Sequence, residues 1–124
     1  MSGDSFPVVW SGPTAVVAAE GEIDLTNAEG LRDALLSALN AGASGLIVDL
    51  TGTTLLDSAG VTAVVRSVRR ASATDSTVRL AATAPPVLRV LNLVGIDRLV
   101  SIYPSVAEAV ASLPGEQTGH DLRA

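Results

Sequence analysis

The chain has 124 residues, enough for one domain with a hydrophobic core and too few for two. Its formal net charge of −5 disfavours binding to nucleic acid or to an anionic membrane, and the absence of cysteine excludes disulfides and thiolate sites. Because hydrophobic residues make up 48% of the chain and aromatic residues only 2%, the core must consist of Val, Leu, Ile and Ala, as is typical of α/β proteins.

Two segments bear on the location of the protein. The uncharged stretch 34–48 is too short and too polar to span a bilayer. Residues 1–6 lack the basic region and apolar segment of a secretory signal. We therefore expect a cytoplasmic protein that does not associate with membranes.

The N-terminal part of the chain has the pattern of a hairpin followed by a helix. Residues 8–11 and 15–19 are short β-type runs separated by Gly-Pro, which predicts two antiparallel strands. Residues 20–24 are polar and are interpreted as a turn. Thr26 and Glu29 have the spacing of a capping box, which predicts the start of a helix.

A compact apolar run and a patterned helix follow. Residues 46–50 predict a buried strand with 46–48 in the middle of the sheet, and residues 51–54 are interpreted as a polar turn. After the tetrapeptide 57–60, valines at positions 61, 64, 65 and 68 recur at helical spacing, which predicts a helix with an apolar face. From periodicity, the core should include Val48, Val61, Val65 and Leu91.

The C-terminal part repeats the strand and helix pattern. Residues 78–82 predict a strand, Pro85 and Pro86 suit the first turn of a helix, and residues 99–103 predict the last strand. A second capping box, Ser105 to Glu108, predicts the final helix.

The order of these elements indicates an α/β fold. Strand–helix–strand units require parallel pairing through right-handed crossovers, whereas the first hairpin is antiparallel, so we expect a mixed, mostly parallel sheet packed with about four α-helices. Residues 1–114 are expected to form one domain. Residues 115–124 are polar after Pro114 and are expected to be a disordered tail.

Sites for catalysis, metals or cofactors are not predicted. His120 lies in the expected tail, where no carboxylate could orient it against a nucleophile. Gly-rich phosphate-binding motifs are absent, and Asp24, Asp49 and Asp57 lack the spacing of metal ligands. We therefore expect a binding protein that is not an enzyme.

The tetrapeptide Asp57-Ser58-Ala59-Gly60 has two interpretations. In the first, Asp57 and Ser58 only cap the following helix. In the second, Ser58 accepts a phosphate, because the unpaired N–H groups and the dipole at a helix N-terminus favour negative charge. A phosphoserine there would add about −1.5 to −2 charges without melting the helix.

Three segments together resemble the STAS-domain family, and specifically the anti-sigma-factor antagonists. They are Gly-Glu-Ile-Asp at 21–24, the strand and Asp-Ser-Ala-Gly within 48–61, and the helix ending in Gly-Ile within 87–96. Each motif is loose alone, but their order and spacing extend the resemblance over residues 8–113. Position 59 is Ala where many relatives carry Ser or Thr, which leaves Ser58 as the only hydroxyl directly after Asp57.

The resemblance implies a STAS fold and a partner switch. The unphosphorylated antagonist would bind an anti-sigma factor that is also a serine kinase, and so release a sigma factor. The kinase would phosphorylate Ser58 and break the complex, and a PP2C-type phosphatase would restore it. The resemblance places Asp24 and Asp57 beside Ser58, Ala59 and Gly60 on the docking surface of a chain expected to be monomeric when free.

Two other functions remain open at this point. A STAS domain can be an accessory subunit of an ABC-type lipid transporter, where it binds the ATPase subunit. Some STAS domains bind nucleotides as sensors, although no ligand-binding motif in the sequence supports this.

Overall fold

A computed structural model of the chain describes residues 6–114. Its strands form one sheet in the order β1-β2-β3-β4-β5, in which β1 is antiparallel to β2 and the other neighbours are parallel. The strands are β1 (Val8–Ser11), β2 (Thr14–Ile23), β3 (Gly45–Leu56), β4 (Thr77–Ala82) and β5 (Ile102–Tyr103). The predicted mixed sheet is confirmed.

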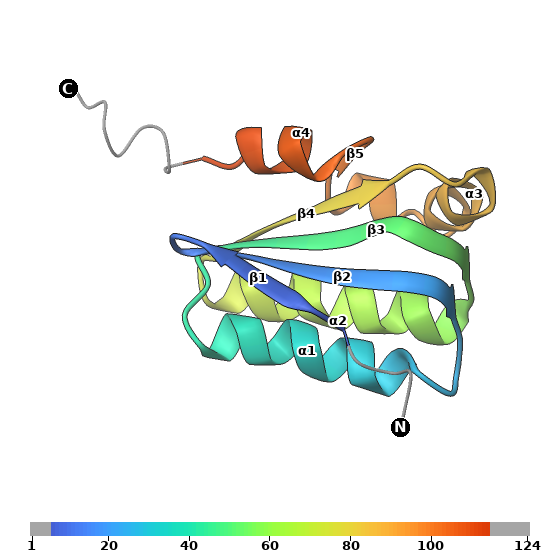
Figure 1. Cartoon of the computed structure of the whole chain (residues 1–124), viewed down its shortest axis with the longest axis horizontal. Helices are drawn as coiled ribbons and strands as arrows, with labels where there is room; N and C mark the ends of the chain where they lie inside the picture. The colour runs from blue at the N-terminus through green and yellow to red at the C-terminus, as the bar shows by residue number, and fades with distance from the viewer. Residues whose placement is uncertain (1–5, 115–124) are drawn as a thin grey trace.

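Helices cover both faces of this sheet. In Figure 1, α1 and α2 lie against one face and α4 lies against the other. A 3₁₀ helix, η1 (Ile96–Arg98), follows α3. The α-helices of the described part are α1 (Ala28–Asn40), α2 (Ser58–Ala73), α3 (Pro85–Leu93) and α4 (Val106–Ala111). The α/β fold class and the alternation of strands and helices after the first hairpin are therefore as predicted.

The alternation of side chains along β3 divides the core between the two faces. Leu46, Val48 and Leu50 belong to the larger cluster, which contains residues of α1, α2 and α3. Ile47 points the other way and packs with Ala109 and Leu113. Because β3 lies between β2 and β4, the prediction that 46–48 occupies the middle of the sheet is confirmed.

The two expected polar turns, 20–24 and 51–54, are wrong. Residues 20–23 are the end of β2, and they pair in parallel with residues 52–56 of β3. The buried hydroxyl of Thr53 donates to the Ala19 carbonyl at 2.8 Å. Each segment has polar and glycine residues typical of a turn, but pairing with the other segment, across register shifts, continues both strands.

The two expected capping boxes have different outcomes. The prediction at Ser105 is confirmed, because its side chain accepts from the Glu108 N–H at 3.1 Å. At Thr26 the predicted helix start is confirmed to within one residue, but the predicted cap is wrong, because α1 begins after Asn27 without a side-chain cap. The Thr26 hydroxyl donates to Asp24 at 2.6 Å, so a competing local acceptor holds it away from the helix.

Two further expectations need correction. Residues 99–103 do not form one strand: Leu99 and Val100 follow η1, both donating to the Ile96 carbonyl, and only Ile102 and Tyr103 pair with β4. Val65 is half-buried, whereas Val48, Val61 and Leu91 are buried as expected.

The expected tail, 115–124, and His120 lie outside the described residues. No helix found within 6–114 has both the length and the apolar character needed to cross a bilayer.

Candidate functional site

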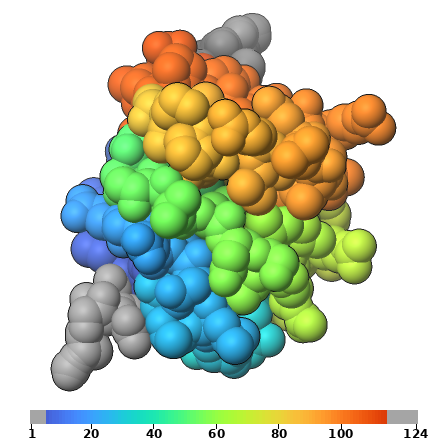
Figure 2. All heavy atoms as spheres, turned by 90° about the vertical axis from the view of Figure 1, so that its right-hand side faces the viewer, coloured from blue at the N-terminus to red at the C-terminus, as the bar shows by residue number. Residues whose placement is uncertain are grey.

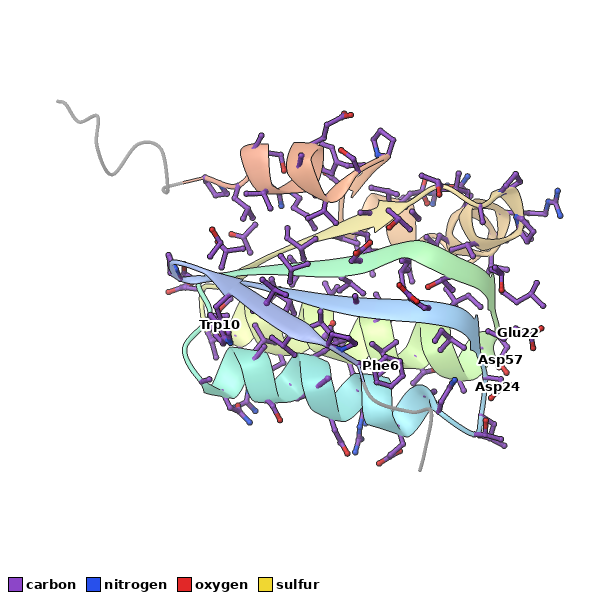
Figure 3. The ribbon with its side chains drawn as sticks, in the orientation of Figure 1. Phe6, Trp10, Glu22, Asp24 and Asp57 are labelled. Carbon is purple, nitrogen blue, oxygen red and sulfur yellow. The ribbon has the colours of Figure 1, made fainter. Side chains whose placement is uncertain are left out.

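The carboxyl ends of β2 and β3 bring Asp24 and Asp57 to one end of the molecule (Figure 3). The Asp57 N–H donates to the Ile23 carbonyl at 3.0 Å, which ties the start of α2 to the end of β2. Both aspartates line a hollow of about 340 Å³, bounded on its far side by residues of α3. Figure 2 views the molecule from this end.

Asp57 is the N-cap of α2, and Ser58 is the first residue of the helix. The Asp57 carboxylate accepts from the Ala59 N–H at 2.9 Å and from the Gly60 N–H at 3.3 Å. Two N–H groups expected to be unpaired are therefore already occupied by a carboxylate. The Ser58 side chain is exposed, and the Ser58 carbonyl accepts from the Thr62 hydroxyl at 2.9 Å.

Gly60 is buried directly beneath this surface. A Cβ at position 60 would lie 2.5 Å from Leu56 Cδ1 and 2.8 Å from Ile23 Cγ2. The absence of a side chain lets α2 approach the ends of β2 and β3 closely. Gly60 therefore positions Ser58 and Asp57 and is itself hidden from a partner.

Asp24 organises the loop between β2 and α1. Its carboxylate accepts from the backbone N–H and hydroxyl of Thr26, and these bonds, the hydroxyl first, hold the pKa of Asp24 below its ordinary value of 3.8. The Asn27 side chain accepts from the Asp24 N–H and donates to the Glu22 carbonyl, both at 2.9 Å. The carboxylate is therefore ionised at neutral pH and held by local bonds.

The structure adds residues that sequence reasoning did not select. Leu25 is 82% exposed and Leu55 is 49% exposed, so apolar side chains lie next to the acidic ones. Glu22 and Arg89 also line the hollow. Glu22 belongs to the motif at 21–24 and could have been selected with Asp24, whereas only tertiary packing brings Arg89 to this site.

Asp49 accepts from the Thr51 N–H at 3.0 Å and from the Thr51 hydroxyl at 2.7 Å, within β3 and apart from Asp24 and Asp57 in the sequence. Within residues 6–114, no three His, Cys, Asp or Glu side chains form a group that could hold a metal ion. Asp24 therefore orders the loop before α1 and Asp57 caps α2, whereas Asp49 forms its bonds within β3.

Solved structures share this fold along almost their whole length. An anti-sigma factor antagonist from Mycobacterium paratuberculosis has 23% identity and a TM-score of 0.82, covering 92% of this chain and 98% of that one. Unphosphorylated SpoIIAA, an anti-sigma factor antagonist, has 24% identity and a TM-score of 0.74, covering 86% and 93%. Phosphorylated SpoIIAA from Bacillus has 21% identity and a TM-score of 0.68, covering 86% and 97%.

A family model gives the broader assignment. The model of the STAS domain matches residues 7–109, which include every strand and the site at Asp24 and Asp57. The structural likenesses, at these identities, concern the fold and agree with that match. The chain belongs to the STAS-domain family.

Proposed function

We propose that this chain is an anti-sigma-factor antagonist of the partner-switching type, acting in the cytoplasm. It binds an anti-sigma factor that is also a serine kinase. This binding frees the sigma factor, which can then direct transcription of its genes. Phosphorylation of Ser58 ends binding, and a PP2C-type phosphatase restores it. The chain itself acts by binding and has no catalytic role.

The position of Ser58 carries the proposal. Its side chain is exposed at the first position of α2, where a kinase can reach it without unfolding the helix. The exposed Leu25 and Leu55 provide apolar contact area for a partner near the acidic groups. The surface therefore combines a modifiable hydroxyl with features of a protein interface.

The capping bonds of Asp57 explain how a phosphate could act as a switch. A phosphate on Ser58 would stand beside the Asp57 carboxylate, which already occupies the N–H groups of Ala59 and Gly60. The phosphate would therefore face the partner, because the N–H groups at the start of α2 that could bind it already bond to Asp57. Repulsion and the cost of desolvating the phosphate should break the complex while the fold remains intact.

The test uses Ser58→Ala as bait to isolate the kinase from a cell extract. Purified wild-type chain is then incubated with this kinase and ATP, and mass spectrometry locates the phosphate. Calorimetry compares the affinity of each form. We expect modification at Ser58, near wild-type binding by Ser58→Ala, and at least about tenfold weaker binding by phosphorylated chain and by Ser58→Asp.

Thr62→Val is the matched control, because Thr62 is also exposed and lies one turn further along α2. It should be phosphorylated and bind like the wild type. Phosphate at Thr53, Thr54 or Thr62, or equal affinity of the modified and unmodified chains, would refute the proposal. Isolation of a transporter ATPase subunit in place of a kinase would support the accessory-subunit function.

A further inference from the structure

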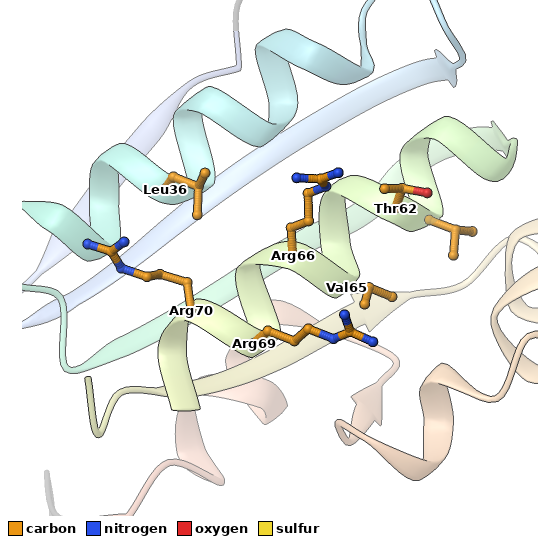
Figure 4. Close-up of a pocket in the computed structure, with 7 residues that line it drawn as sticks. Leu36, Thr62, Val65, Arg66, Arg69 and Arg70 are labelled. Carbon is orange, nitrogen blue, oxygen red and sulfur yellow. The ribbon is translucent and has the colours of Figure 1, made fainter. Parts of the chain in front are cut away.

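A second surface lies along α2, away from the hollow at Asp24 and Asp57. It is a groove of about 590 Å³ over the surface of α2, bordered on the α1 side by Leu36, which we call the arginine groove (Figure 4). The apolar part of the groove is formed by Leu36, Val61 and Val65. The charged part is formed by Arg66, Arg69 and Arg70. All three arginines are exposed.

The positive charge of this groove is not neutralised locally. Among residues 6–114, the ion pairs are those of Arg32 with Glu29 and Asp33, so both of these α1 carboxylates are already engaged. Arg70 donates to the Asn40 side chain, a neutral partner, at 2.7 Å. Three cations therefore cluster on a protein whose net charge is −5.

Stabilisation of α2 does not account for the cluster. Cations favour the last turn of a helix, and only Arg70 lies there. Arg66 and Arg69 lie further toward the N-terminus, where the effect of the helix dipole falls off. Their charges are available to a partner.

We propose that the arginine groove binds an acidic amphipathic helix of a protein partner. Charge complementarity selects carboxylates, and the half-buried Leu36 and Val65 offer contact area to the apolar side of such a helix. Positions 66, 69 and 70 span about 6 Å along α2, which matches carboxylates one turn apart on a docked helix. This surface is additional to the switch at Ser58.

The directions of the side chains distinguish this occupant from a small anion. Figure 4 shows Arg66 and Arg70 extending from α2 toward α1, whereas Arg69 extends on the opposite side beside Val65. Guanidinium groups that bind one phosphate converge on it. These groups are spread along and across the groove, as suits carboxylates distributed over a helix.

The test titrates the isotopically labelled full chain with a synthetic amphipathic helix of about 18 residues, Glu on one side and Leu on the other. We expect NMR shifts at Leu36, Val65 and 66–70. The affinity should fall when the salt concentration rises from about 0.05 M to about 0.3 M, because salt screens the charges. The same peptide with Gln in place of Glu should bind at least about tenfold more weakly.

Variants separate the groove from general charge effects. Arg66→Gln with Arg69→Gln should weaken binding at least about tenfold, and each single change should weaken it less. Arg98→Gln is the control: it removes one positive charge from η1, outside the groove, and should leave the affinity for the peptide unchanged. Ser58→Asp should bind the peptide like the wild type, because position 58 lies outside the arginine groove. Loss of peptide binding therefore tests the groove separately from the phosphorylation switch at Ser58.

Four outcomes would overturn the proposal. They are no shifts in the groove, shifts at the Ser58 end instead, equal affinity for the Glu and Gln peptides, and displacement of the peptide by ATP or inorganic phosphate at a concentration where NaCl of the same ionic strength does not displace it. Dimerisation of the chain through this groove, detected by ultracentrifugation, would also overturn it, because the occupant would then be a second copy.

Discussion

Gly60 lies where α2 comes closest to the ends of β2 and β3. Ala in place of Gly in a helix ordinarily stabilises it by about 1 kcal/mol. Here the added methyl would meet Leu56 and Ile23 at 2.5 and 2.8 Å, so we expect Gly60→Ala to lower the free energy of unfolding by about 1–3 kcal/mol. Urea denaturation measures this change.

The cause of that loss can be checked separately. In a Leu56→Ala background, which removes one of the two clashing groups, Gly60→Ala should cost less than in the wild type. A Gly60→Ala chain as stable as the wild type would show that the approach of α2 does not depend on glycine.

Asp24 provides a second prediction at the level of a single residue. The Thr26 hydroxyl is the larger cause of its lowered pKa, ahead of the Thr26 backbone N–H, so Thr26→Val should raise the pKa of Asp24 toward 3.8. Carboxyl NMR titration measures the shift. Thr62→Val, a control on α2, should leave the pKa of Asp24 unchanged, and an equal shift in both variants would contradict the assignment.

The sign of the pH effect follows from the lowered pKa. The folded chain favours ionised Asp24 more than the unfolded chain does, so this contribution to stability is complete above pH 3.8, the ordinary pKa. It is lost as the pH falls through the lower pKa of the folded state. The part of the stability difference between wild type and Thr26→Val that comes from ionised Asp24 should therefore disappear in acid.

At the level of elements, α3 provides a matched pair of leucines. Leu91 is fully buried in the core cluster, whereas Leu93 is 78% exposed. Leu91→Ala should reduce the free energy of unfolding by about 2–5 kcal/mol, because it leaves a cavity. Leu93→Ala should change it by less than about 0.5 kcal/mol. Equal losses would mean that α3 does not pack as described.

Helix starts show how far local sequence can predict an element. Ser105 and Glu108 form the predicted cap, and within residues 6–114 no other hydrogen bond engages the Ser105 side-chain oxygen. At Thr26 the same pattern marks a helix start but forms no cap, because Asp24 is only two residues away and accepts the hydroxyl. A capping pattern is therefore a good predictor where its residues have no stronger local competitor.

The ends of β2 and β3 show structure that local sequence could not predict. Gly52 and Thr53 favour a turn when read locally, yet they continue β3 because Glu20 and Gly21 pair with them. The partner is about thirty residues away in the sequence, so no local pattern could indicate it.

At the level of the whole molecule, charge is distributed unevenly. Glu22, Asp24 and Asp57 line the hollow at one end, and the arginine groove lies along α2 on the helical face. The net charge of −5 disfavours nucleic acid and anionic membranes as partners but could not predict a cationic groove. A groove depends on how α1 and α2 pack, and packing joins residues such as Leu36 and Arg69 that are far apart in the sequence.

The sequence by itself determined the fold class, the order of the main elements and the segment 57–60 as the candidate site. Apolar periodicity and turn chemistry are local, and they suffice to separate buried strands from amphipathic helices. Only the tertiary structure decided that β2 and β3 extend to the site and that Leu25, Leu55 and Arg89 border it. Burial, backbone pairing and the shape of a surface depend on contacts between distant segments, and these exist only in the folded chain.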